Sequence, residues 1–191
     1  MSSGSSMVNV RGSAIVARLR FIQMRYGEAA LRAVVERFSP AHRRIVEAGV
    51  PARMWVPFRL FLELNVTVDQ LLGRGDLAIC YEMGRYAAEA NVPRLYQGFY
   101  RFGNPRFTFR KALALWNWHF DSGKLLTSDE EDGITVLRIE DFDEPHRAHC
   151  MSTLGWLTKS TEMSGGKVEE ATELACRTKG DPACQLVVQW R

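Results

Sequence analysis

The sequence lacks the features that would assign a function directly. No run of apolar residues approaches the roughly 18 that a membrane-spanning helix needs, and the opening MSSGSSM lacks the charged and apolar regions of a secretory signal peptide. The P-loop and the catalytic patterns G-x-S-x-G, G-x-G-x-x-G and H-E-x-x-H are missing as well. We therefore expect a cytoplasmic protein that does not enter a membrane and is not an enzyme.

Charge of one sign is also scarce. With 25 Lys and Arg against 22 Asp and Glu, the formal net charge is +3, which is too small to indicate a nucleic-acid partner. Cysteine is limited to four residues. In a reducing compartment these cysteines indicate metal binding or core packing rather than disulfides.

The sequence does contain enough apolar material for one domain. Hydrophobic residues make up 46% of the 191 residues, which is ordinary for a chain that buries its own core. We expect residues 1–8 to form a disordered tail and residues 9–191 to form a single domain.

Apolar residues recur at helical spacing through the first two-thirds of the chain, and shorter runs follow. Helices are predicted over 15–26, 28–38, 40–49, 57–72, 77–90, 104–120 and 145–163. Strands are predicted over 134–139, 168–177 and 184–190. Helices followed by a small antiparallel sheet, with a helix packed on that sheet, make an α+β fold.

The strongest chemical signal lies near the C-terminus. Glu173, Cys176 and Cys184 flank a turn, and Cys150 lies near the start of the preceding predicted helix. Three thiolates and a carboxylate meet the tetrahedral, sulfur-rich preference of zinc. Because Glu173 and Cys176 are an odd number of residues apart, a regular strand would turn them to opposite faces. A bulge near Leu174 is therefore needed to bring them together.

Other interpretations of these residues remain open. The cysteines can be buried free thiols that pack as small apolar side chains. His146 and His149 lie close to Cys150 in the sequence and are alternative metal ligands. A position on the protein surface is the second interpretation of these two histidines.

One pattern of cysteine, glycine and glutamate spacing runs through this region: Cys150-x4-Gly155-Trp156, then Gly165-Gly166, then Glu173-x2-Cys176-x3-Gly180-x3-Cys184. The pattern resembles the vinyl-4-reductase domain, especially its version in phenol-sensing transcriptional regulators. In that version a cysteine, a glutamate and two further cysteines at these separations hold a zinc ion. The resemblance implies one structural zinc in a closed site that leaves no position for water, with the ligands Cys150, Glu173, Cys176 and Cys184.

Further landmarks follow one another along the chain: Arg11-Gly12-Ser13-Ala14, Tyr26-Gly27-Glu28, Trp55-Val56-Pro57, Gly73-x-Gly75-Asp76, Glu82-Met83-Gly84-Arg85 and Trp116-x3-Phe120-Asp121-x-Gly123. Their order resembles an uncharacterised family that is abundant in myxobacteria. That family is similar to the NO-signalling and Golgi-transport ligand-binding fold, which haem nitric-oxide sensors share with the Bet3-like vesicle-tethering subunit. The resemblance implies this fold and a homodimer built through the N-terminal helices.

The haem sensors carry an axial histidine and a Y-x-S-x-R pattern, and that pattern is missing here. We therefore expect no haem. A dense set of aromatic residues is instead a candidate lining for a pocket that binds a small apolar or aromatic ligand. The candidate residues are Tyr100, Trp116, His119, Phe120 and Trp156. Ordinary core packing is the alternative role for these side chains.

These observations predict a non-enzymatic small-molecule-binding or sensor domain with a structural zinc site. Its signal is expected to pass to a protein partner that the sequence does not identify. The alternative is a Bet3-like adaptor that acts through protein contacts, as a dimer with a filled core and no ligand.

Overall fold

The computed structural model describes residues 7–91, 105, 112–131 and 133–191. The first part is mainly helical and consists of β1 (Asn9–Arg11), α1 (Gly12–Glu36), α2 (Pro40–Glu47), β2 (Trp55–Pro57), α3 (Phe58–Leu72) and α4 (Ala78–Asn91). The second part consists of α7 (Ala112–His119), β3 (Lys124–Glu131), β4 (Ile134–Glu140), α8 (Arg147–Met163), β5 (Val168–Ala175), the 3-10 turn η1 (Arg177–Lys179) and β6 (Cys184–Trp190). The predicted α+β class is confirmed.

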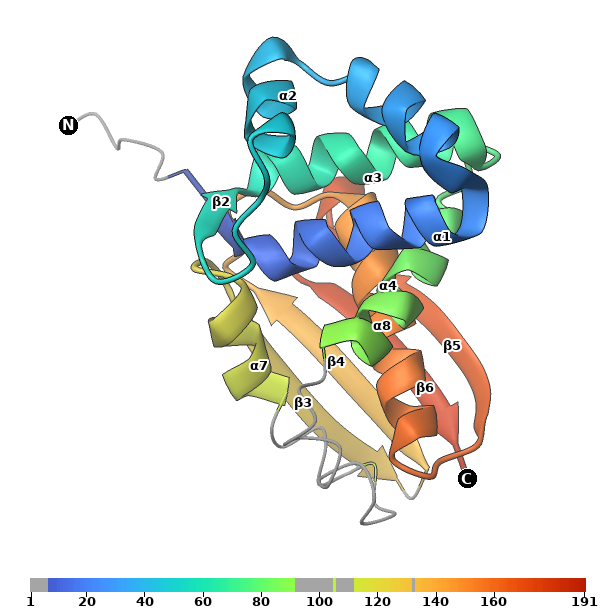
Figure 1. Cartoon of the computed structure of the whole chain (residues 1–191). Helices are drawn as coiled ribbons and strands as arrows, with labels where there is room; N and C mark the ends of the chain where they lie inside the picture. Colours follow the sequence, from blue (N-terminus) through green and yellow to red (C-terminus); the bar gives the residue numbers. More distant parts are fainter. Residues whose placement is uncertain (1–6, 92–104, 106–111, 132) are drawn as a thin grey trace, which may run out of the picture.

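The larger sheet is antiparallel and has the strand order β3-β4-β6-β5. Thr135, Leu137 and Ile139 of β4 are buried at alternate positions, because successive strand residues face opposite sides of a sheet. Leu186 and Val188 of β6 pair with β4 residues in register and are buried with them. Helix α8 lies over this sheet, α4 crosses α8, and α1, α2 and α3 gather at one end (Figure 1). None of the described helices is both long enough and apolar enough to cross a bilayer.

Helices α4 and α8 cross where each of them carries a glycine. A Cβ on Gly84 would lie 1.9 Å from the carbonyl oxygen of Ser152, and a Cβ on Gly155 would lie 1.9 Å from that of Tyr81. The two backbones therefore approach each other with no side chain between them, which only glycine permits. This crossing fixes the position of α8 against α4. Helix α8 supplies residues to both sites described below.

Helix α1 changes direction at Gly27. This residue has φ 84° and ψ 172°, which are not helical values, so the helical segments on either side meet at a kink. The sequence pattern predicted two helices separated at this glycine. The structure has one continuous helix with a kink there, which explains why the apolar spacing is interrupted at Gly27. Val34 in the second segment is fully buried, which holds this segment against the core.

The strands of the first half and the first strand of the larger sheet were not predicted. β1 and β2 form a separate antiparallel pair in which Val10 lies opposite Val56. Val8, at the end of the predicted tail, is buried, and its carbonyl accepts a hydrogen bond from the Phe58 amide at 2.8 Å. β3 has the sequence KLLTSDEE, which has no alternation of apolar and polar residues, so its sequence gives no strand signal.

Candidate functional site

Three cysteine side chains meet beside the turn between β5 and β6. Cys150 lies in the first turn of α8, Cys176 follows β5, and Cys184 begins β6. Their sulfur atoms all lie within 4.8 Å of one another, and all three side chains are buried and free of disulfides. We call these residues the thiol cluster. Three sulfur donors at this spacing can hold an ion that prefers tetrahedral thiolate ligation.

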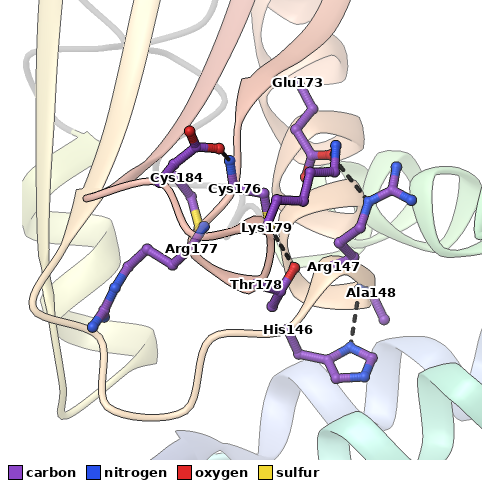
Figure 2. A network of polar contacts seen from close by, with 10 residues as sticks. His146, Arg147, Ala148, Glu173, Cys176, Arg177, Thr178, Lys179 and Cys184 are labelled. Carbon is purple, nitrogen blue, oxygen red and sulfur yellow. Dashed lines mark hydrogen bonds and ion pairs between the residues drawn. The ribbon is translucent and has the colours of Figure 1, made fainter.

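Hydrogen bonds within the β5–β6 turn position two of these sulfurs (Figure 2). The carboxylate of Asp181 accepts a bond from the Cys176 amide at 2.7 Å. The amide of Arg177 donates to the Cys184 sulfur at 3.4 Å, and the hydroxyl of Thr178 lies 3.0 Å from the Cys176 sulfur. The turn therefore holds both sulfurs in place by itself.

The cluster thiols ionise differently. The hydrogen bond with Cys184, together with burial, raises the pKa of the Cys150 thiol. The same hydrogen bond, followed by the bond from the Arg177 amide, lowers the pKa of Cys184 to about 6 against the opposing effect of burial. The lowered pKa favours the thiolate form of Cys184, which is the form of cysteine that binds metal ions.

Glu173 lies next to the cluster and is held by two cations. The register of β5 against β6 shifts between Glu173 and Ala175, and Leu174 turns outward with 63% exposure, so the required bulge is present. The Glu173 Oε2 accepts hydrogen bonds from Arg147 Nε at 3.0 Å and Lys179 Nζ at 3.1 Å (Figure 2). Its Oε1 is buried and has no hydrogen-bond partner in the described part of the chain. The structure thus brings the three cysteines together and leaves one carboxylate oxygen unused.

The two histidines near Cys150 take other positions. His146 Nδ1 accepts a hydrogen bond from the Ala148 amide at 3.1 Å and caps the start of α8. His149 packs among aromatic rings and contacts Phe58 and Phe142 with ring centroids 5.1 and 4.8 Å away. Within the described ranges, the metal-capable group that contains Cys150 consists of cysteines alone.

A cavity of about 70 Å³ lies between the helices and the larger sheet. Side chains from α1, α3, α4, α7 and α8 line it, together with residues of β3 and β4. The predicted pocket residues Trp116, His119, Phe120 and Trp156 all line this cavity, whereas Tyr100 lies outside the described residues. Most of the wall is apolar, so each polar group in it bears on what the cavity can bind.

His149 is a polar group in this wall that lacks a partner. Burial, followed by the nearby charge of Arg18, lowers the pKa of His149 to about 3, so the imidazole is neutral. Its Nε2 is buried and has no hydrogen-bond partner among the described residues. A neutral imidazole nitrogen in this state can bind a ligand atom or a metal ion.

His119 is the second imidazole of the wall. Burial lowers its pKa to about 4, although a hydrogen bond to the Leu115 carbonyl opposes the shift. Its Nδ1 lies 2.9 Å from that carbonyl oxygen, which can only accept a hydrogen bond, so Nδ1 carries the proton. His119 Nε2 therefore keeps a lone pair and acts as an acceptor or a metal ligand.

Arg18 is the wall residue that the sequence interpretation missed. It is only 4% exposed and lines the cavity from α1. The sequence could have indicated its burial, because Arg18 lies four residues after Ala14 and four before Ile22 on the same helix face, and both of these residues are buried. A charged residue on the apolar face of a helix marks either a buried ion pair or a binding site.

No protein-family model and no curated protein matches the sequence. The resemblance to the vinyl-4-reductase domain therefore rests on the motif residues alone.

Several solved structures match the fold. An H-NOX protein from S. oneidensis in the Fe(II)NO ligation state has a TM-score of 0.74 and 12% identity, over 95% of this chain and 99% of that chain. An unliganded Fe(II) H-NOX protein from K. algicida gives 0.73 and 9%, over 95% and 96%. An oxygen-binding H-NOX domain related to soluble guanylate cyclases gives 0.64 and 10%, over 95% and 95%. The expected fold of haem nitric-oxide sensors is thereby confirmed.

The expectation of no haem is contradicted by these comparisons. The matching structures include H-NOX proteins in the Fe(II), Fe(II)NO and oxygen-bound states. Another matching structure addresses the redox potential of haem in a distorted porphyrin. We expected no haem because the Y-x-S-x-R pattern is missing. However, the side chain that holds haem iron is set by the folded pocket and does not depend on this pattern. This pocket contains two neutral imidazoles, His119 and His149, so the missing pattern is not an argument against haem.

Proposed function

We propose that this chain is a non-enzymatic sensor module that binds a small molecule in the cavity and passes the binding event to a protein partner. The observation that carries the proposal is the buried His149 Nε2, which has no partner within the described residues. An unsatisfied buried polar group destabilises a fold by roughly 1–3 kcal/mol. A ligand that bonds to this nitrogen removes that penalty, so binding and stability are coupled.

The walls define the class of ligand. Trp116, Phe120 and Trp156 offer large apolar surfaces, which favour a small apolar or aromatic body. Haem is among the candidates, because the unpartnered Nε2 of His149 and the lone pair of His119 are donors of the kind that hold haem iron, although a porphyrin needs more room than the cavity of about 70 Å³ offers in this structure. His119 or His149 would hold the iron of a bound haem, which would supply a binding site for a diatomic gas.

Ligand-dependent thermal stability tests this proposal. The melting temperature is measured with a panel of small apolar and aromatic molecules, and separately with haemin followed by nitric oxide. A ligand at a hundred times its Kd stabilises the native state by about 2.7 kcal/mol. We expect at least one ligand to raise the Tm of the wild type and to have a reduced effect on His149→Phe. If no ligand changes the Tm, the sensor function is excluded and the adaptor interpretation replaces it.

The proposal includes a structural zinc at the thiol cluster. Cys150, Cys176 and Cys184 would supply three sulfurs, and the free Oε1 of Glu173 would become the fourth ligand. The reduced state of all four cysteines fits a cytoplasmic location, where thiols are not oxidised. Elemental mass spectrometry of purified protein should find about one zinc per chain, and a metal-free protein of unchanged stability would exclude this part.

A homodimer through the N-terminal helices also belongs to the proposal. It follows the fold resemblance and would bring the same helices that line the cavity close to a second copy. Light scattering during gel filtration measures the mass directly, and a mass near 21.7 kDa would exclude the dimer.

A further inference from the structure

The guanidinium of Arg18 lies in the cavity wall and forms no ion pair with a carboxylate among the residues that the structure describes. Its Nε donates to the Asn65 side-chain oxygen at 3.3 Å and its Nη1 donates to the Ala14 carbonyl at 2.7 Å. Its Nη2 donates to the Ser152 hydroxyl, and its Cζ lies 4.1 Å from the centre of the Phe61 ring. All of these partners are neutral, and no carboxylate in the described ranges forms an ion pair with Arg18.

This arrangement departs from the usual treatment of buried charge. A buried charge without an opposite charge is strongly unfavourable, so buried arginines are normally paired with carboxylates. A guanidinium has five N–H donors, and the three bonds above leave two of them available. Burial lowers the pKa of Arg18 to about 9, so the group is still positive at neutral pH.

The other titratable groups near Arg18 in the described chain do not neutralise it. Cys80 interacts with Arg18, but burial raises the pKa of this thiol to about 12, so it stays neutral at pH 7. His119 and His149 are neutral, and the charge of Arg18 contributes to the low pKa of both. Asp69 is buried in α3, but both of its carboxylate oxygens accept the amide of Leu77 at 3.2 Å, ahead of α4. The cavity therefore combines apolar walls with one uncompensated positive charge.

We infer that the ligand of this cavity carries a carboxylate, which Arg18 binds through its guanidinium, on a small apolar body enclosed by the aromatic walls. The inference rests on the proposed function and adds the chemical class of the ligand. Arginine binds carboxylates through two parallel N–H donors, and the two unused donors are available for this contact. The cavity of about 70 Å³ is smaller than the roughly 150 Å³ cavity that holds benzene, so a short-chain acid is the best fit.

The test compares each acid with its own amide, since the pair differs mainly in charge. Acetate, propionate and butyrate are titrated at fixed ionic strength alongside acetamide, propionamide and butyramide, with calorimetry and the fluorescence of Trp116 and Trp156 as readouts. We expect at least one acid to bind the wild type about tenfold more tightly than its amide. This comparison needs no variant and stands even if a substitution at Arg18 impairs folding.

Three variants locate the effect. Arg18→Gln should remove the preference for the acid and leave amide binding unchanged, whereas Arg18→Lys should retain part of it. Arg20→Gln on the exposed side of the same helix is the matched control and should behave as the wild type.

Equal affinity for acids and amides in the wild type would overturn the carboxylate inference and leave the sensor proposal intact. An acid preference that persists in Arg18→Gln would also overturn it. Absence of binding by every acid and amide, together with a Tm unchanged by neutral ligands and haemin, would overturn both.

Discussion

His149 and Cys150 are neighbours in the sequence, yet they belong to two different sites. Consecutive residues of a helix point about 100° apart, so α8 turns His149 toward the aromatic cavity and Cys150 toward the thiol cluster. Within the described residues, the Nε2 of His149 in the cavity has no hydrogen-bond partner, and Arg18 bonds only to neutral groups. In the cluster, Cys176 and Cys184 are already held by hydrogen bonds from their own turn, although the Oε1 of Glu173 beside them has no partner in the described part of the chain.

This difference separates a site that stabilises the fold from a site that responds to a ligand. Polar groups that the protein satisfies by itself hold one geometry, whereas buried groups left unsatisfied gain from an added molecule. We therefore propose a structural role for the thiol cluster and a sensing role for the cavity. The following predictions separate these roles, beginning with the largest expected effect.

Cys176→Ser should remove the metal and destabilise the domain. Because a structural zinc contributes roughly 10 kcal/mol to the folding of small domains, losing one thiolate should lower the free energy of unfolding by about 3 kcal/mol or more. Metal analysis and thermal unfolding measure both effects. Cys80→Ser is the matched control, because Cys80 is buried outside the cluster and its sulfur donates a hydrogen bond to the Asn65 carbonyl. Unchanged metal content and Tm in Cys176→Ser would contradict the assignment.

Gly155→Ala should weaken both sites together, because it pushes α8 away from α4. The new Cβ would meet the Tyr81 carbonyl oxygen at 1.9 Å, and overpacking of this kind destabilises by about 1–3 kcal/mol. Chemical denaturation measures the loss. Gly84→Ala, on the opposite helix, should give a loss of similar size, and the double variant should be non-additive because both changes separate the same pair. Wild-type stability in either variant would contradict the close crossing.

Lowering the pH should destabilise the fold through the cavity histidines. The pKa of His149 is about 3 in the folded protein and ordinarily 6.5, so below pH 6.5 the unfolded chain gains a proton that the folded protein does not. Stability is therefore fully present above pH 6.5 and falls as the pH drops toward 3. Between pH 7 and pH 5 this one residue should account for about 2 kcal/mol.

His149→Phe should remove that part of the pH dependence. The substitution also removes the unsatisfied nitrogen, so it should raise stability at pH 7 by about 1 kcal/mol while reducing the stabilisation by a ligand. Denaturant unfolding at pH 7 and pH 5 gives both quantities. A pH dependence identical to that of the wild type would show that His149 titrates normally.

Glu173→Gln should have the smallest effect on stability. The Glu173 side chain is only 5% exposed, but its partners Arg147 and Lys179 are 44% and 52% exposed. The amide oxygen of glutamine can still accept their hydrogen bonds, so the loss should be about 1 kcal/mol. Zinc affinity should nevertheless fall, because an amide oxygen is a weaker ligand than a carboxylate. Competition with a zinc chelator measures the affinity, and an unchanged value would remove Glu173 from the ligand set.

The fold could be predicted from the sequence where periodicity was strong. The helical spacing in α3 and the alternation in β4 and β6 depend on burying one face, and such patterns are visible in sequence. β3 could not be predicted, because its second half, Ser128 to Glu131, is polar and acidic and has no alternation of apolar and polar residues. The kink at Gly27 was detected as an interruption, but only the structure shows that the segment after it packs back onto the core.

The two sites differed in how well the sequence revealed them. The thiol cluster follows a spacing rule between a few cysteines, so Cys150, Cys176 and Cys184 could be grouped before the structure was known. The cavity joins α1, α7 and α8, which are far apart in the chain, and no local spacing brings Arg18 next to His149. The aromatic residues Trp116 and Trp156 were singled out by type, but the charge that they surround became visible only in three dimensions.

The most direct test of these separate roles is a side-chain NMR spectrum of the four histidines during titration with butyrate. Two of them, His119 and His149, line the cavity, while His146 caps α8 next to the thiol cluster and His42 lies on α2. The account predicts that the ring nitrogen signals of His119 and His149 shift with butyrate and saturate together, while those of His42 and His146 stay in place. Shifts confined to His146, or no shift at either cavity histidine, would contradict it.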